Sequence, residues 1–327
     1  MGTKEIIRVE GLSKKFGEVQ AVDQVTFSVR EGEIFGFLGP NGAGKTTTIR
    51  MLVGLLKPDA GWAWVNGYDP FKDPVRAKES VGVVPEGSNL YGELSAWDNL
   101  VYMGQLYGVP KKEWASRSEE LLREFNLLDR RDGKFQGLSR GMKRRLTIAA
   151  ALVHRPCILF LDEPTTGLDV MSARGLRGVV KKLKEKGVTV FLTTHLIQEA
   201  EDLCDRVAII VKGKIRIIDT PQALKEKVRE TEVLEIRVQP LPPALSEDME
   251  AIPGVEKATI AEDRLRLYGK TLHGSVGPII NRLDQGGGRI LSIQTLTPTL
   301  EDAFVKLTGV DVEVMRVDKP MKMGGMG

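Results

Sequence analysis

An eight-residue run near the N-terminus has the residue types and the spacing needed to hold a polyphosphate. A glycine, four residues and then Gly-Lys-Thr occur together once, in Gly39-Pro40-Asn41-Gly42-Ala43-Gly44-Lys45-Thr46. Glycines let such a loop wrap phosphates with successive backbone N–H groups pointing inward. A helix starting near Lys45 would add the partial positive charge of its N-terminus. We expect Lys45 to reach the β- and γ-phosphates and the Thr46 hydroxyl to ligate Mg²⁺, with Thr47 beside the phosphates.

Two adjacent carboxylates narrow the class of protein. By itself the loop indicates only a P-loop nucleoside triphosphatase, which includes GTPases, kinases and helicases. Asp162 and Glu163 follow the apolar run Cys157–Leu161, which is typical of a buried strand. Asp162 would hold Mg²⁺ through water, and Glu163 would polarise the attacking water. The alternative is a solvated turn, but the upstream loop favours hydrolysis with water as the acceptor.

A third motif lies between these two and shows a family resemblance. The run is Leu138-Ser139-Arg140-Gly141-Met142, just before a predicted helix. It resembles the Leu-Ser-Gly-Gly-Gln signature of ABC transporter nucleotide-binding subunits: Ser139 and Gly141 match, whereas Arg140 and Met142 differ. The resemblance implies that Ser139 and Gly141 bind the γ-phosphate of an ATP held by a second subunit. A hydroxyl, backbone N–H groups and a helix dipole suit an anion. Ser139 is expected to be a helix N-cap in either case.

The resemblance implies roles for three more residues of the nucleotide site. Phe16 occupies the place of the aromatic ring that stacks on adenine; its alternative is simple packing within a turn. Asp169 belongs to a loop that crosses the dimer interface and contacts nucleotide. His195, at a strand end, matches the switch histidine that contacts the γ-phosphate. The implied catalytic residues are therefore Glu163, His195 and Lys45.

One position departs from the family pattern in its chemistry. The family usually has Gln after the strand Val81–Pro85, and this chain has Glu86. A carboxylate can bind Mg²⁺ or a water, but it adds a negative charge beside the phosphates. Glu86 is thus a candidate nucleotide and metal ligand, and the loop from Glu86 through Trp97 is expected to face the membrane partner.

The elements that position these residues alternate in the manner of an α/β protein. The P-loop follows the short apolar run Glu33–Leu38 and precedes helical spacing over Thr46–Leu56. We expect an α/β P-loop core with an antiparallel β subdomain near the N-terminus and a helical insertion at about 96–151. Further strands are predicted at 158–161, 188–192 and 206–210.

The composition changes near residue 230, where a second domain is predicted. Strand and helix patterns there follow a β(α)ββαβα order, which suits a small α+β domain, ferredoxin-like or close to it. We expect an ATPase domain at 4–225, the α+β domain at 230–310 and a disordered tail at 311–327. The small domain is expected to stabilise a dimer, and the alternative is a regulatory small-molecule site.

Bulk composition is that of an ordinary globular protein. The chain has 327 residues, 42% hydrophobic and 28% charged, with a net charge of +3. Such a weak charge favours neither nucleic acid nor an anionic membrane as a partner. Basic residues between Lys111 and Arg145 are interpreted as a solvated helical face in preference to a phosphate-binding patch. No apolar run approaches the ~20 residues of a membrane span, and the N-terminus lacks a signal-peptide core.

These features together lead to an expected function and location. The two cysteines are interpreted as buried thiols of a reducing cytosol. The resemblance covers about 4–222, and its details are similar to the daunorubicin-resistance and sodium-export ATPases. By analogy with that branch, it implies an ATP- and Mg²⁺-dependent motor for export that forms a homodimer or pairs with another ATPase subunit. It would drive a separate integral-membrane permease from the cytoplasmic face.

The alternative function is a non-transport ABC ATPase that acts on a cytosolic or nucleic-acid assembly. DNA-repair members need a long coiled coil and translation factors need two ATPase cassettes, and the sequence shows neither. No nucleic-acid partner is therefore expected. A guanine-reading Asn-Lys-x-Asp motif is also missing after Asp162, which argues against a GTPase.

Overall fold

The computed structural model describes residues 4–228, 232–240, 245–296, 298–310 and residue 315. They form two compact units, one up to Ile218 and one from Asp219. The tail predicted to be disordered, 311–327, lies outside the described residues except for Met315. The boundary between the two units comes earlier in the chain than the domain boundary predicted between residues 225 and 230. The reason is that helix α8 (Pro221–Glu226) packs against α11 (Leu300–Thr308) within the second unit.

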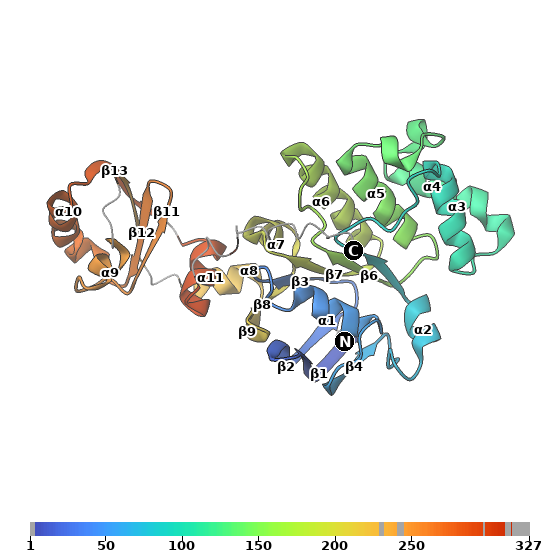
Figure 1. The fold of residues 1–327 in the computed structure, drawn as a ribbon, viewed down its shortest axis with the longest axis horizontal. Coiled ribbons are helices and arrows are strands. Elements are labelled where there is room, and N and C mark those ends of the chain that lie inside the picture. Colours follow the sequence, from blue (N-terminus) through green and yellow to red (C-terminus); the bar gives the residue numbers. More distant parts are fainter. Residues whose placement is uncertain (1–3, 229–231, 241–244, 297, 311–314, 316–327) are drawn as a thin grey trace, which may run out of the picture. The chain divides into compact units, whose positions relative to one another are not determined.

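A six-stranded sheet forms the centre of the first unit (Figure 1). Its order is β5-β6-β7-β3-β8-β9, and the neighbours from β5 to β8 are parallel. The strands are β3 (Ile34–Leu38), β5 (Val81–Val84), β6 (Ile158–Asp162), β7 (Thr189–Thr194), β8 (Arg206–Val211) and β9 (Lys214–Asp219). Because parallel strands end at the same edge, the segments that follow β3, β6 and β7 meet there.

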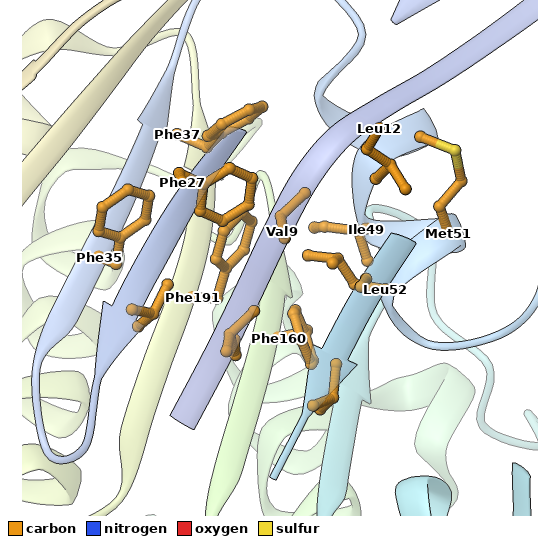
Figure 2. Packing of buried hydrophobic residues seen from close by; sticks show 14 of the residues in the cluster. Val9, Leu12, Phe27, Phe35, Phe37, Ile49, Met51, Leu52, Phe160 and Phe191 are labelled. Carbon is orange, nitrogen blue, oxygen red and sulfur yellow. The ribbon is translucent and has the colours of Figure 1, made fainter. Parts of the chain in front are cut away.

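A three-stranded antiparallel sheet packs on this centre. Its order is β2-β1-β4, with β1 (Glu5–Phe16), β2 (Val19–Arg30) and β4 (Ala60–Val65). The ring of Phe27 in β2 lies 5.5 Å from that of Phe35 and 5.9 Å from that of Phe191, both in the central sheet. Figure 2 shows these rings gathered in one buried cluster. The two sheets therefore share a core, and aromatic burial of this kind is a large stabilising contribution.

Helices cover the central sheet and form the insertion. In the first unit they are α1 (Lys45–Leu52), α2 (Pro74–Glu79), α3 (Ala96–Leu106), α4 (Trp114–Glu124), α5 (Arg140–Ala151), α6 (Val170–Glu185) and α7 (Ile197–Leu203). Helices α3, α4 and α5 pack on one another as the predicted insertion. Helix α1 ends before the predicted Leu56, because Gly54 turns the chain with a φ of 71°. The expected α/β core with its antiparallel sheet and helical insertion is confirmed.

The second unit is a smaller α+β fold with a core of its own. It comprises β10 (Glu232–Gln239), α9 (Leu245–Glu250), β11 (Lys257–Ala261), β12 (Arg264–Gly269), α10 (Val276–Gln285), β13 (Arg289–Leu296), α8 and α11. The sheet order is β11-β12-β10-β13, and every pairing is antiparallel. From β10 to β13 the chain has the β-α-β-β-α-β order of the ferredoxin-like motif. Alternate residues of β10, such as Leu234 and Ile236, pack against Ile279 and Leu283 of α10 in one cluster.

No helix within the described part of the chain is both long and apolar enough to cross a membrane.

Candidate nucleotide site

Two glycines of the phosphate loop are required by close approach of the backbone. A Cβ on Gly39 would lie 2.2 Å from the carbonyl oxygen of Ile210 in β8. Gly44, which precedes α1, has a φ of 104°, and a Cβ there would lie 2.3 Å from the carbonyl oxygen of Ala21. Both positions exclude a side chain. The loop is thus held tightly between β8 and the antiparallel sheet, with its helix beginning directly behind it.

The ammonium group of Lys45 is buried at the centre of the site. Its Nζ donates to the carbonyl oxygens of Gly39, at 2.6 Å, and Pro40, at 3.1 Å. It also lies 3.0 Å from Oε1 of Glu163. The P-loop lysine and the carboxylate after β6, 118 positions apart in the sequence, therefore form an ion pair.

Asp162, the last residue of β6, is bonded from two sides. Thr46 Oγ1 donates to Asp162 Oδ1 at 3.2 Å, and Thr193 Oγ1 of β7 donates to the same oxygen at 2.6 Å. A hydroxyl and a carboxylate are hard oxygen donors of the kind that Mg²⁺ takes from proteins. Mg²⁺ usually takes its other ligands from phosphates and waters. The pair therefore fits a magnesium ion bound together with a nucleotide.

Glu163 adopts an unusual backbone conformation. Its φ is 49°, in the left-handed region that a residue with a side chain rarely adopts. Its N–H donates to the carbonyl oxygen of Thr193 at 3.1 Å. The carboxylate oxygen Oε2 accepts from Thr166 Oγ1 at 3.2 Å and lies 2.7 Å from Nδ1 of His195, the first residue after β7. The left-handed turn thus aims the carboxylate at both Lys45 and His195.

The surroundings of Glu163 decide what its carboxylate can do. Burial favours the neutral acid, but the hydrogen bond to His195 and the charge of Lys45 outweigh it and lower the pKa of Glu163 to about 2. A base with so low a pKa holds a proton weakly at neutral pH. In this arrangement Glu163 is suited to orienting a water molecule, and the carboxylate stays charged while it does so.

The signature residues Ser139 and Gly141 lie at the start of one helix, and Asp169 lies at the start of another. Ser139 is the N-cap of α5 and accepts from Met142 N at 3.3 Å. Asp169 is the N-cap of α6 and accepts from Ser172 N at 2.9 Å. Gly141 is buried where the helices meet, and a Cβ on it would lie 2.6 Å from Ser172 Oγ. The described contacts of these residues run within α5 and α6 and do not include the phosphate loop.

Phe16 and Glu86 lie on the surface. Phe16 ends β1 with 49% of its surface exposed, and Lys14 Nζ lies 5.8 Å from its ring centroid. About half of Phe16 is therefore left uncovered by the residues around it. Glu86 follows β5 and is exposed, and the hydrogen bond described for it is accepted by its main-chain carbonyl. Among the hydrogen bonds and ion pairs of the described residues, none joins the Glu86 carboxylate to Thr46 or Asp162.

Sequence reasoning missed two residues of the site, Thr193 and Arg144. Arg144 lies in the basic stretch interpreted as a solvated face, and that interpretation is wrong for it, because only 8% of the residue is exposed. Its guanidinium donates to the main-chain carbonyl oxygens of Asp162 and Pro164, on either side of Glu163. The available signal was its helical spacing from the apolar Ile148, which puts Arg144 on the buried face of α5.

A phosphate loop after β3, an Asp-Glu pair at the end of β6 and a histidine after β7, all at one edge of a parallel sheet, define a P-loop nucleoside triphosphatase. The family described as ABC transporter matches residues 22–166. The chain is 36% identical over 306 residues to the linearmycin resistance ATP-binding protein of Bacillus subtilis (strain 168), covering 93% of this chain and 98% of that protein. It is 37% identical over 309 residues to the Nod factor export ATP-binding protein I of Ralstonia nicotianae, covering 94% and 95%. The chain belongs to the ATP-binding, ATP-hydrolysing subunits of ABC transporters.

Solved structures agree with this assignment. An ATP-binding subunit of an ABC transporter superposes with a TM-score of 0.62 at 32% identity, covering 68% of this chain and 92% of that one. A dimeric ATP-binding cassette in a post-hydrolysis state, bound to ADP and Pi, gives a TM-score of 0.59 at 27% identity, covering 65% and 98%. The expected family, fold and ATPase activity are confirmed.

Proposed function

We propose that this chain is the ATPase subunit of an exporter, that it dimerises around ATP, and that it drives a separate membrane permease from the cytoplasmic face. The main support for ATP hydrolysis at this site is the position of the Glu163 carboxylate, which lies between Lys45 and His195 beside the phosphate loop. The export direction is supported by relatives that are named for resistance and for Nod factor export. The ATPase would occupy residues 4–225, with 230–310 as an appended domain.

Each residue of the site would have a distinct role in binding or hydrolysing ATP. The loop Gly39–Thr46 and Thr47 would bind the phosphates, and Phe16 would stack on adenine. Thr46 and Asp162 would hold Mg²⁺, which supplies charge neutralisation of the phosphate oxygens when bound. Glu163 would orient the attacking water, and His195 would keep Glu163 in place and contact the γ-phosphate.

A second subunit would complete the site. Ser139 and Asp169 begin exposed helix N-termini, and such N-termini attract phosphate groups. Beside Asp169, Val170 and Met171 leave 79% and 72% of their surfaces exposed at the start of α6. Apolar residues so exposed beside a polar cap favour a surface that a partner subunit covers. The segment from Glu86 to Trp97, which is exposed at residues 86–89 and at Tyr91 and Glu93, is the candidate for contact with the permease.

The Glu163→Gln variant tests this function. Glutamine keeps the size of the side chain and removes the charge, so ATP binding should persist while turnover falls by about 100-fold or more. Unhydrolysed ATP should then hold two chains together, which light scattering after size exclusion would detect as an ATP- and Mg²⁺-dependent dimer. Phosphate release measures the turnover.

The matched control is Glu120→Gln, because Glu120 is an exposed glutamate in an ion pair with Arg155 on the helical insertion. It should keep wild-type turnover and remain monomeric. A Glu163→Gln variant that hydrolyses ATP at the wild-type rate would contradict the catalytic assignment. A variant that stays monomeric in saturating ATP would contradict the ATP-bridged dimer.

A further inference from the structure

Arg144 forms a hub of main-chain hydrogen bonds beneath the nucleotide site. Its Nε donates to the carbonyl oxygen of Pro164 at 2.9 Å, and one terminal nitrogen donates to that of Asp162 at 2.7 Å. The other terminal nitrogen donates to the carbonyl oxygens of Pro85 and Glu86. Four carbonyl acceptors, from the end of β6 with the residues after it and from the segment after β5, thus share one buried cation.

Two of these acceptors flank Glu163 on either side. The carbonyl oxygens of Asp162 and Pro164 belong to the residues before and after it. Glu163 itself is held at a φ of 49°, a left-handed conformation that is strained for a residue with a side chain. Such a conformation persists only when its surroundings impose it. Thr193 bonds the N–H of Glu163, and Arg144 bonds the carbonyls around it.

The other two acceptors belong to the segment that follows β5. Arg144 bonds Pro85 and Glu86 there, and Thr147, on the next turn of α5, has its Oγ1 3.3 Å from Ser88 Oγ. Further along, a Cβ on Gly82 of β5 would lie 2.3 Å from the carbonyl oxygen of Ala151. One face of α5 is therefore docked along β5 and the loop after it.

Helix α5 also carries the signature residues at its N-terminus. Ser139 caps it, and Gly141 packs against Ser172 of α6. Arg144 thus lies one turn from the signature and bonds both the Glu86 segment and the backbone of Glu163. The three segments cannot move independently without breaking bonds to a buried guanidinium, whose unpaired burial is costly.

Arginine is the side chain that suits this hub. A guanidinium is planar and carries five N–H donors in a fixed fork, whereas a lysine ammonium carries three on a flexible stem. Burial lowers the pKa of Arg144, and the nearby carboxylates of Asp162, Glu199, Glu86 and Glu163 act against this. Since arginine remains charged in proteins, the hub also places a positive charge among these acids.

We infer that Arg144 is a positioning residue for ATP hydrolysis: it holds the backbone of Glu163 in its catalytic conformation and ties that conformation to α5 and the segment after β5. The inference rests on the proposed role of Glu163. Through Arg144, a displacement of the Glu86 segment or of the signature helix would reach the catalytic carboxylate without passing through the nucleotide.

The test compares Arg144→Met and Arg144→Lys in the full-length chain. Methionine keeps much of the side-chain volume without any donor, and a small misplacement of a catalytic group can cost about 100-fold in rate. We expect kcat for Arg144→Met to fall by about tenfold or more, while the dissociation constant for ATP changes by less than about threefold. Arg144→Lys should regain only part of kcat. Arg123→Met is the control, because Arg123 is exposed and pairs with Glu119 one turn earlier on α4; it should match the wild type.

A double variant shows whether Arg144 acts through Glu163. Residues that act as a unit have non-additive effects. Arg144→Met should therefore lower kcat about tenfold in the wild type but leave the residual turnover of Glu163→Gln unchanged. A further tenfold fall in that background would overturn the inference, as would an unchanged kcat in the single variant. Loss of soluble protein with both Met and Lys would also overturn it, because Arg144 would then serve folding alone.

The same set of variants separates this inference from the proposed function. If Glu163→Gln keeps wild-type turnover, the catalytic assignment of Glu163 fails and the inference fails with it. If Glu163→Gln is inactive and Arg144→Met is fully active, only the inference fails.

Discussion

At the scale of single residues, Glu163 is held by neighbours that come from different parts of the chain. Lys45 comes from the phosphate loop, His195 from the end of β7, and Arg144 reaches its backbone from α5. The charge of Lys45 and the hydrogen bond of His195 favour the ionised carboxylate. Glu163 is therefore a stabilising residue as well as a candidate catalytic one, and the two roles can be measured separately.

The stabilising role has a defined dependence on pH. Because folding lowers the pKa of Glu163 from 4.5 to about 2, ionisation contributes about 3 kcal/mol to the free energy of unfolding. This contribution is complete above pH 4.5 and is lost as the pH falls from there through 2. The difference in unfolding free energy between wild type and Glu163→Gln is measured first at pH 5, where the Glu163 contribution is almost fully present. It should shrink by about 1 kcal/mol or more by pH 3.5. Denaturant titrations without nucleotide would measure it, and a difference independent of pH would contradict the ion-paired state of Glu163.

How far these residues could be predicted depends on whether a motif encloses them. Lys45, Thr46, Asp162 and Glu163 belong to short motifs, so their types and spacing pointed to the site, and the structure brings them together. Thr193 joins the site only because β6 and β7 are neighbours in parallel register, which pairs it with Asp162. Such strand neighbours are not encoded in any local pattern.

At the scale of elements, the start of α5 packs closely against α6 through two small residues, Gly141 and Ser172. A Cβ on Gly141 would lie 2.6 Å from Ser172 Oγ and 2.9 Å from Ser172 Cβ. Along the same pair of helices, a Cβ on Gly175 would lie 2.7 Å from a terminal nitrogen of Arg145. The signature glycine is therefore required by helix packing as well as by any contact with nucleotide.

This packing predicts a rescue experiment. Gly141→Ala should lower the free energy of unfolding, because the new methyl group collides with Ser172 and overpacking costs about 1–3 kcal/mol. Adding Ser172→Gly removes both colliding atoms and should restore most of the loss. Chemical denaturation of the single and double variants measures the two values. A double variant no more stable than Gly141→Ala alone would contradict the packing argument.

Two strands of the first unit, β4 and β9, were not predicted, because the local sequence of each gives only a weak strand pattern. β4 contains Gly61, at a φ of 77°, where a Cβ would lie 2.3 Å from the backbone of Gly11. Glycine in a strand weakens the pattern, and here it permits close approach to β1. β9 is an edge strand whose residues are only partly buried or exposed. Its formation depends on β8, which the pattern of β9 alone does not reveal.

At the scale of the whole molecule, the chain forms two units whose described hydrophobic clusters share no residue. The phosphate loop, the Asp162-Glu163 pair and His195 all belong to the first unit. The composition change near residue 230 predicted a second domain, but the position of α8 was decided by its packing on α11, a contact between distant segments.

Separate cores should unfold in separate steps. We expect two transitions in differential scanning calorimetry. Saturating Mg-ADP should stabilise the first unit alone, by about 2.7 kcal/mol at a nucleotide concentration 100-fold above the dissociation constant. ADP is chosen because it is not hydrolysed further at this site. A single cooperative transition, or an equal shift of both transitions, would show that the two units unfold together.

The position of β3 in the central sheet has a consequence for how the protein is made. β3 leads into the phosphate loop, yet it lies between β7 and β8, where Ile34 pairs with Val190 and Phe35 with Arg206. At about 5–20 residues per second, the ribosome completes those partners roughly 10–30 s after β3. During that time a wholly apolar, buried strand has neither neighbour, which makes it a natural substrate for chaperones. A nascent chain therefore cannot bind ATP until most of its first unit has been synthesised.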